Sequence, residues 1–159
     1  MKLKKPTHDY GKGFCGIGVF QPKTYENIGT LIRSAKMFGA DFVFTIGKRY
    51  KKQNSDVSLS TKIPVFYFET LKDFYISMPP VIKYVAIDLC DKATKLQNFQ
   101  HPKQGIYILG SEDNGLPKEI LESNRFNFLE IEGEHSLNVA VAGSIILYDR
   151  FIKFNQPPK

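Results

Sequence analysis

Apolar residues in this chain gather in short runs that alternate with segments in which they recur at helical spacing. The runs are rich in β-branched and aromatic residues and too short for helices, which is typical of buried strands. Gly16 and Gly18 in the first run indicate a close approach by a neighbouring backbone. The sequence therefore predicts strands at Phe14–Phe20, Asp41–Ile46, Val65–Phe68, Val81–Leu89, Ile106–Leu109 and Phe126–Ile131.

Three segments have a helical pattern. Apolar residues recur every three or four positions through Tyr25–Phe38, and Gly39 directly after them is a typical helix stop. A second helix is predicted over Leu71–Ile76. From Leu137 to Leu147 nearly every helical face is apolar, which predicts a buried helix rather than one lying on the surface. Ser136, just ahead of it, has a hydroxyl that can cap its free N–H groups.

The alternation of strands and helices predicts an α/β fold with a mostly parallel sheet and helices on both faces. A length of 159 residues fits one domain, and we expect it to span 1–159 with a polar, basic arm at 1–12 and a tail at 155–159. No apolar run is long enough to cross a bilayer, and the arm lacks the apolar core of a secretion signal. A cytoplasmic location is therefore expected.

A formal net charge of +6 favours a polyanionic partner such as RNA or DNA, although a basic protein can also be soluble without one. The densest basic run follows Gly47, and its tyrosine could stack on a base while its cations meet phosphates. Alternatively, this run is only a solvated loop. The lysines of the arm could extend the same patch. The run consists of Lys48, Arg49, Tyr50, Lys51 and Lys52.

Cysteine and histidine spacing gives no sign of a metal site. Cys15 and Cys90 lie in apolar, strand-like runs, which favours buried thiols over a disulfide, a metal site or a nucleophile. His8, His101 and His135 are far apart and lack the spacing of metal ligands, so we expect no bound metal. Of these histidines, His135 is the one expected near a functional site.

The residues from 110 to 117 form a loop with two glycines and an Asp-Asn pair, which suits a turn whose bare backbone lies against a flat ligand. Earlier in the chain, Arg33 lies one helical turn after Gly29, which has no side chain, so the guanidinium has open space beside it for an anion. Alternatively, Arg33 is only a surface arginine beside a helix glycine. Asn27 could cap that helix, hold Arg33 or bind a substrate, and Glu112 could pair with Arg33 across the site.

Three separated motifs together resemble the SpoU (TrmH-like) branch of the SPOUT RNA methyltransferases. They occur in that family's order, and the resemblance covers residues 14 to about 154. Each motif alone is a weak signal, whereas the three in order are specific. The motifs are Asn27-x-Gly29-x-x-x-Arg33, Leu109-Gly110-x-Glu112-x-x-Gly115-Leu116 and Ser136-Leu137-Asn138-Val139-Ala140-Val141-Ala142.

The resemblance implies transfer of a methyl group from S-adenosylmethionine to a ribose 2′-hydroxyl of tRNA or rRNA, by a homodimer with a deep carboxyl-terminal trefoil knot. It implies a catalytic set of Asn27, Arg33, Glu112, Ser136 and Asn138. The implied cofactor-binding residues are Ile87, Gly110, Gly115, Ile131, Ser136 and Leu137, and the implied RNA-binding residues are Arg33 with the basic run. This chain departs from many relatives after Ile131, because Glu132 stands where those relatives often have a proline. The link from Glu132 to His135 is also short, and both differences bear on how tightly the cofactor binds.

The family assigns activation of the 2′-hydroxyl to Arg33. An arginine stays protonated and is a poor base, so our hypothesis is that Arg33 binds phosphate and stabilises the developing alkoxide, with Asn27 and Glu112 orienting it. An alternative function is a SPOUT-like RNA-binding module without methyl transfer. A generic nucleotide-binding domain is disfavoured because no Gly-x-Gly-x-x-Gly follows the first strand.

Overall fold

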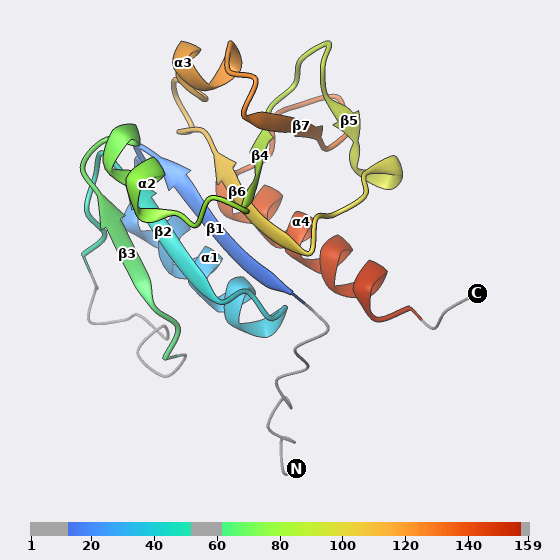
Figure 1. Cartoon of the computed structure of the whole chain (residues 1–159), viewed down its shortest axis with the longest axis horizontal. Helices are drawn as coiled ribbons and strands as arrows, with labels where there is room; N and C mark the ends of the chain where they lie inside the picture. Colours follow the sequence, from blue (N-terminus) through green and yellow to red (C-terminus); the bar gives the residue numbers. More distant parts are fainter. Residues whose placement is uncertain (1–12, 52–61, 157–159) are drawn as a thin grey trace.

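A single all-parallel sheet organises the part of the chain that the computed structural model describes, residues 13–51 and 62–156 (Figure 1). Its seven strands follow the order β3-β2-β1-β6-β4-β7-β5. The predicted strands are confirmed, with ends that differ by a few residues at most, and the predicted mostly parallel sheet is parallel throughout. The strands are β1 (Phe14–Phe20), β2 (Phe42–Ile46), β3 (Val65–Phe68), β4 (Lys83–Ile87), β5 (Thr94–Lys95), β6 (Gln104–Leu109) and β7 (Phe126–Glu130).

Helices cover both faces of this sheet, as predicted. The long helices α1 and α4 pack on one face and form one core with it, whereas α2 and α3 pack on the other face and form a second core. None of the described helices is long and apolar enough to span a bilayer. The helices are α1 (Tyr25–Met37), α2 (Leu71–Ser77), α3 (Lys118–Leu121) and α4 (Val139–Phe154), with a short 3-10 helix at Leu96–Asn98.

The glycines of β1 make room for aromatic rings rather than for a neighbouring backbone alone. A Cβ on Gly16 would overlap the Phe42 ring, and one on Gly18 would overlap both the ring and the carbonyl oxygen of Phe44. Both rings come from β2 and belong to the core beneath α2 and α3. The close approach predicted at these glycines is therefore chiefly a side-chain approach, which lets large rings fill the middle of the sheet.

The caps of the two long helices differ from the predicted ones. Thr24 caps α1 by accepting a hydrogen bond from the Asn27 N–H at 3.4 Å, so Asn27 lies inside the first turn. Asn138 caps α4, because its Oδ1 accepts from the N–H groups of Ala140 at 2.9 Å and Val141 at 3.3 Å. The predicted capping roles of Asn27 and Ser136 are wrong, since each stands two or three residues from the actual cap. The helix end at Gly39 is confirmed.

The cysteines are both free thiols, as expected, but only one is fully buried. Cys15 lies inside β1, and burial raises the pKa of its thiol to about 11. Cys90 is half-buried in the loop after β4 rather than within a strand, because β4 ends at Ile87. A thiol that stays protonated is a poor nucleophile.

A buried polar cluster ties β6 to α4 at the end of the sheet opposite the carboxyl ends of the strands. The His101 side chain is only 1% exposed; its Nδ1 lies 2.7 Å from the Tyr107 hydroxyl and its Nε2 lies 2.8 Å from Asp149 Oδ2. Lys153 forms an ion pair with the same carboxylate at 2.7 Å. Burial is the main cause that lowers the pKa of His101, and it outweighs the opposing effect of Asp149.

This lowered pKa makes the stability of the fold depend on pH. In the unfolded chain the imidazole takes up a proton near pH 6.5, whereas in the folded chain it resists protonation, so the unfolded state binds more protons below pH 6.5. The free energy of unfolding should therefore be fully retained above pH 6.5 and should decrease as the pH falls below it. Urea unfolding between pH 5.5 and 7.5 measures this, and His101→Gln should flatten the dependence while His135→Gln, at an exposed position, should not.

Candidate active site

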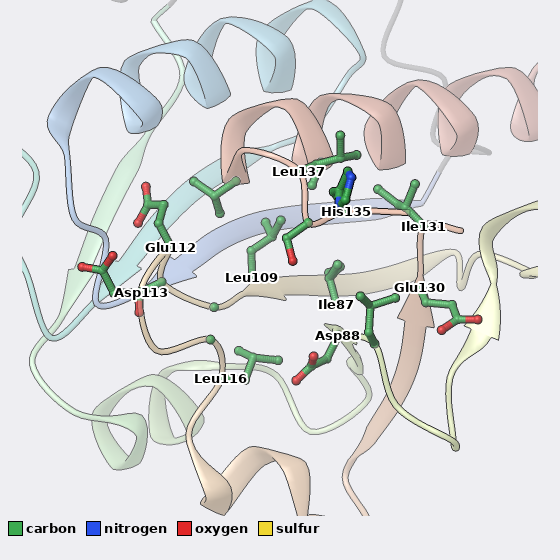
Figure 2. Close-up of a pocket in the computed structure, with 17 residues that line it drawn as sticks. Ile87, Asp88, Leu109, Glu112, Asp113, Leu116, Glu130, Ile131, His135 and Leu137 are labelled. Atoms are coloured by element: carbon green, nitrogen blue, oxygen red, sulfur yellow. The ribbon is translucent and has the colours of Figure 1, made fainter. Parts of the chain in front are cut away.

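A pocket of about 350 Å³ opens at the carboxyl ends of β4, β6 and β7 (Figure 2). Crevices at this edge of a parallel sheet are where α/β proteins commonly bind nucleotides. The loop after β6, residues 110–116, forms one wall, and the loop after β7, residues 131–137, forms another. The start of α4 closes the inner end through Val139 and Ala142.

The wall after β6 is a tight turn that depends on its two glycines. Ser111 and Gly115 exchange backbone hydrogen bonds at 3.3 and 3.0 Å, and Gly115 has a φ of +63°. A Cβ on Gly110 would overlap the carbonyl carbon of Gly115 and lie 2.5 Å from the N atom of Leu116. The sequence prediction of a glycine-dependent turn is therefore confirmed, and the turn brings bare backbone to the pocket surface.

The pocket contains every residue that the resemblance assigned to cofactor binding. They come from three separate parts of the chain, and Leu109 and Leu116 add to the apolar walls. Apolar side chains and exposed backbone suit a flat heterocycle. Their role in binding a cofactor stays a prediction. The residues that the structure brings together here are Ile87, Gly110, Gly115, Ile131, Ser136 and Leu137.

A chain of hydrogen bonds joins the three sequence motifs beside this pocket. The Asn27 amide donates to a carboxylate oxygen of Glu112, and the Asn138 amide donates to Asn27 Oδ1 at 2.9 Å. The second Glu112 oxygen accepts from the Lys23 N–H at 3.1 Å. Because Asn138 also caps α4, these hydrogen bonds fix the amino-terminal ends of α1 and α4 to the loop after β6.

Arg33 stands apart from that chain of hydrogen bonds. It lies on α1 with an exposed side chain, and no ion pair or hydrogen bond of Arg33 occurs among the described residues. The predicted pairing of Glu112 with Arg33 is wrong, because Asn27 and the Lys23 backbone hold Glu112 instead. Six residues of helix separate Arg33 from Asn27 by about 9 Å along the axis. Arg33 does not line the pocket, and its exposed guanidinium is available to a ligand that extends beyond it.

The basic run is more ordered than a solvated loop. Lys48 Nζ donates to the Lys23 carbonyl at 2.8 Å and lies 5.0 Å from the centre of the Tyr25 ring, and Arg49 lies 4.4 Å from the centre of the Tyr67 ring. Tyr50 is half-buried and packs edge-on against Tyr25, which leaves less of its ring for a base. Lys51 is exposed. Lys52 and the arm at 1–12 lie outside the described residues.

Sequence reasoning missed several residues of the site. Lys23 contacts Glu112 through its N–H and Asp113 through an ion pair at 3.1 Å, although these partners are far away in sequence. Asp88 and Glu130, which the sequence did not single out, line the pocket. His135 was not missed, because it is the histidine expected near the site, and it lines the pocket too. The local sequence around a lysine in a turn, or an acidic residue after a strand, does not indicate which distant residue it will contact. The described residues contain no group of His, Cys, Asp or Glu that could hold a metal.

The fold and the pocket define an α/β protein with a pocket of small-molecule size at the carboxyl edge of a parallel sheet. Comparison with protein families identifies which kind. The profile of the SpoU rRNA Methylase family matches residues 16–148, which is most of the chain and includes all three motifs. The chain belongs to the SpoU rRNA methylase family of RNA methyltransferases, as the motifs predicted.

Individual relatives are more distant. A protein of Lactococcus lactis subsp. cremoris (strain MG1363), provisionally named tRNA (cytidine(34)-2′-O)-methyltransferase, is 25% identical over 145 residues, which are 84% of this chain and 85% of that protein. A solved structure described as giving structural insights into the 2-OH methylation of C/U34 on tRNA superposes with a TM-score of 0.73 at 22% identity, covering 88% of this chain and 95% of that one.

A second solved structure contains a cofactor. The AdoMet-bound rRNA methyltransferase from Sinorhizobium meliloti has a TM-score of 0.71 and 22% identity, and the match covers 89% of this chain but only 57% of that one. The shared region is therefore a part of a longer protein in that case. At these identities the two structures establish a common fold.

Proposed function

We propose that this SpoU-family methyltransferase uses S-adenosylmethionine to methylate a ribose 2′-hydroxyl of RNA. The observation that carries the proposal is the chain of hydrogen bonds from Glu112 through Asn27 to Asn138 beside the pocket. These three side chains come from the three separate motifs, and an RNA-binding module without catalysis would not need such a polar set next to a cofactor site. Their contacts support a positioning role for all three.

The residues present fit the cofactor. When bound, S-adenosylmethionine supplies an electrophilic methyl group on a cationic sulfur. The apolar side chains of Ile87, Ile131 and Leu137 and the bare backbone of Gly110 and Gly115 would hold its adenosyl part. A pocket volume of about 350 Å³ is within the range of about 300–1,000 Å³ typical of small-molecule sites. Ser136, also in the pocket wall, would lie near the reacting groups.

Methyl transfer of this kind needs alignment of the ribose oxygen more than covalent assistance. Arg33 is exposed and charged, so it would bind an RNA phosphate through its paired N–H groups and stabilise negative charge that develops on the ribose oxygen. The hydrogen-bonded Asn27 and Glu112 would not orient Arg33 directly, as the sequence hypothesis had it. They would instead fix the start of α1, the helix that carries Arg33.

The substrate we propose is tRNA, with rRNA as the other outcome of the test. A net charge of +6 and the cations Lys48, Arg49 and Lys51 near the start of α1 suit a folded polyanion. Relatives named for methylation at tRNA nucleotide 34 make this the first nucleotide to examine.

Methyl incorporation from labelled S-adenosylmethionine into purified tRNA and rRNA tests the function. Ribose methylation mapped in RNA from cells with and without the protein then identifies the nucleotide. Incorporation at a ribose is expected. Tight RNA binding with no incorporation into either RNA would favour the RNA-binding module instead.

We also propose that two copies of the chain pair through α4. The prediction of a buried helix holds for the side of α4 that packs on the sheet, but an apolar stripe on its other side is open in the single chain. Val141 is 44% exposed, Ile145 37% and Tyr148 51%, and their spacing places them on one side of α4. Leu137, just before the helix, is 46% exposed and extends the stripe. The stripe begins at the pocket wall, so a second copy seated on it would lie next to the site.

Ile145→Glu should convert this dimer to a monomer, since a carboxylate buried in an apolar contact lacks a partner. Sedimentation velocity measures the change in mass. Ile76→Glu is the matched control, because Ile76 is 73% exposed on α2, which covers the opposite face of the sheet. A wild-type chain that sediments as a monomer, or an Ile145→Glu chain that remains dimeric, would contradict pairing through α4.

The trefoil knot of the SPOUT family is part of the proposal for this chain. Its support is the side-by-side placement of the loops after β6 and β7 on one pocket, followed directly by α4. Pulling the chain by its two ends would tighten such a knot. The fully extended length would then be shorter than about 3.3–3.6 Å per residue gives, and the full length would contradict a knot.

A further inference from the structure

The charge of the pocket lining is opposite to the charge of the whole chain. Its lining residues include four carboxylates and no lysine or arginine, although the sequence as a whole has a net charge of +6. Glycine turns and apolar side chains shape the pocket, and the carboxylates add a negative potential to it. The four are Asp88, Glu112, Asp113 and Glu130.

Three of these carboxylates are already engaged by other groups of the protein. Glu112 accepts hydrogen bonds from Asn27 and from the Lys23 N–H, and Asp113 pairs with Lys23 Nζ at 3.1 Å. The hydrogen bond and charge of Glu132 are the main causes that raise the pKa of Lys95, and the nearby charge of Glu130 adds a smaller effect of the same sign. The charge of these three groups is thus partly balanced within the protein.

Asp88 has no such partner. It directly follows β4, where its N–H donates to the Leu129 carbonyl at 3.1 Å and so fixes the backbone beneath the pocket. Among the described residues its carboxylate makes no ion pair and no hydrogen bond. Figure 2 shows the Asp88 side chain facing Leu116 on the pocket side, whereas Glu130 points away toward β5. Asp88 is therefore the carboxylate best placed to act on a bound ligand.

We propose that Asp88 makes the pocket select the charged cofactor over its neutral product. This inference rests on the proposed function. In that reaction the ribose oxygen bonds to the methyl carbon, and the carbon–sulfur bond breaks with its electron pair passing to sulfur. The hydroxyl proton leaves to solvent, and S-adenosylhomocysteine with a neutral thioether remains. An unpaired carboxylate attracts the sulfonium of the substrate and has no such attraction for the thioether, so spent product leaves and fresh cofactor replaces it.

Calorimetric titration with S-adenosylmethionine and S-adenosylhomocysteine tests this selectivity. We expect the wild-type chain to prefer the sulfonium compound, and Asp88→Asn to reduce the ratio of the two dissociation constants about five- to tenfold, as a single partly screened charge does. Asp88→Glu should keep the preference. Asp91→Asn is the matched control, because Asp91 is an exposed acid in the same loop that does not line the pocket, and it should leave the ratio unchanged.

The salt dependence of the wild-type chain gives a second test that needs no variant. Raising KCl from about 0.05 to 0.5 M should weaken binding of the sulfonium compound more than binding of the thioether, because ions screen only the charged interaction. A ratio that changes less than about twofold in Asp88→Asn, or equal salt effects on both ligands, overturns the inference and leaves the proposed function standing. Failure of both ligands to bind the wild-type chain overturns the proposed function and this inference with it.

Discussion

Replacing Arg33 by alanine is expected to lower the rate of methyl transfer about 10²- to 10³-fold, the loss typical when one group that stabilises a developing oxyanion is removed. Arg33 is exposed and has no described partner within the protein, so its removal should leave the fold intact. Incorporation of labelled methyl groups into tRNA measures the rate, and circular dichroism checks the fold. Lys36→Ala is the matched control, because Lys36 is exposed on the same helix and outside all three motifs.

Arg33→Lys distinguishes the role of the guanidinium from that of its charge. A lysine keeps the charge but lacks the planar pair of N–H donors that matches a phosphate. We expect this variant to retain only about a tenth of the wild-type rate, since part of the bidentate contact is lost. Near wild-type rates for Arg33→Lys would show that charge alone suffices and would contradict phosphate recognition through paired N–H groups.

Gly110→Ala is expected to have the second large effect, on cofactor binding. The added methyl group would overlap Gly115 and crowd the N atom of Leu116 at 2.5 Å, so the turn that forms the pocket wall must open. Overpacking of this kind costs about 1–3 kcal/mol, or roughly 5- to 150-fold in affinity if it falls on the bound state. Calorimetry with S-adenosylmethionine measures the loss.

Gly133→Ala is the matched control for this glycine. A Cβ at Gly133, in the loop after β7, would have nothing within 4 Å, and Gly133 is not among the glycines of positive φ. Its cofactor affinity should stay within about twofold of wild type, or about 0.4 kcal/mol. Equal affinity losses in the two variants would mean that the loops respond to any added methyl group rather than to the close contact at Gly110.

Most of the fold could be predicted from the sequence, because its strands are buried on both faces. Phe14–Phe20 and Ile106–Leu109 lie in the middle of the sheet and read as unbroken apolar runs. β5 could not be predicted this way, since Thr94 and Lys95 are both exposed and pair with only the end of β7. The four-residue helix α3 is likewise too short to show a period.

The candidate site was predicted as a set of residues but not as a set of contacts. The motifs named Asn27, Glu112 and Asn138, and the structure joins these three. The predicted partner of Glu112 was wrong, because the sequence favoured Arg33 for its opposite charge. In the structure, position along α1 decides which side chain reaches the loop after β6, and Asn27 in the first turn does so. The caps were wrong for a related reason, since several polar residues precede each helix and only backbone geometry selects one of them.

The place of β1 in the sheet governs how the chain can fold as it is synthesised. β1 can pair with β2 once both have left the ribosome, but its other neighbour, β6, begins only at Gln104. At typical synthesis rates of about 5–20 residues per second, the free edge of β1 stays open for several seconds. An open parallel edge can pair with another nascent chain. The growing chain therefore has an aggregation-prone strand edge until the residues of β6 have been synthesised.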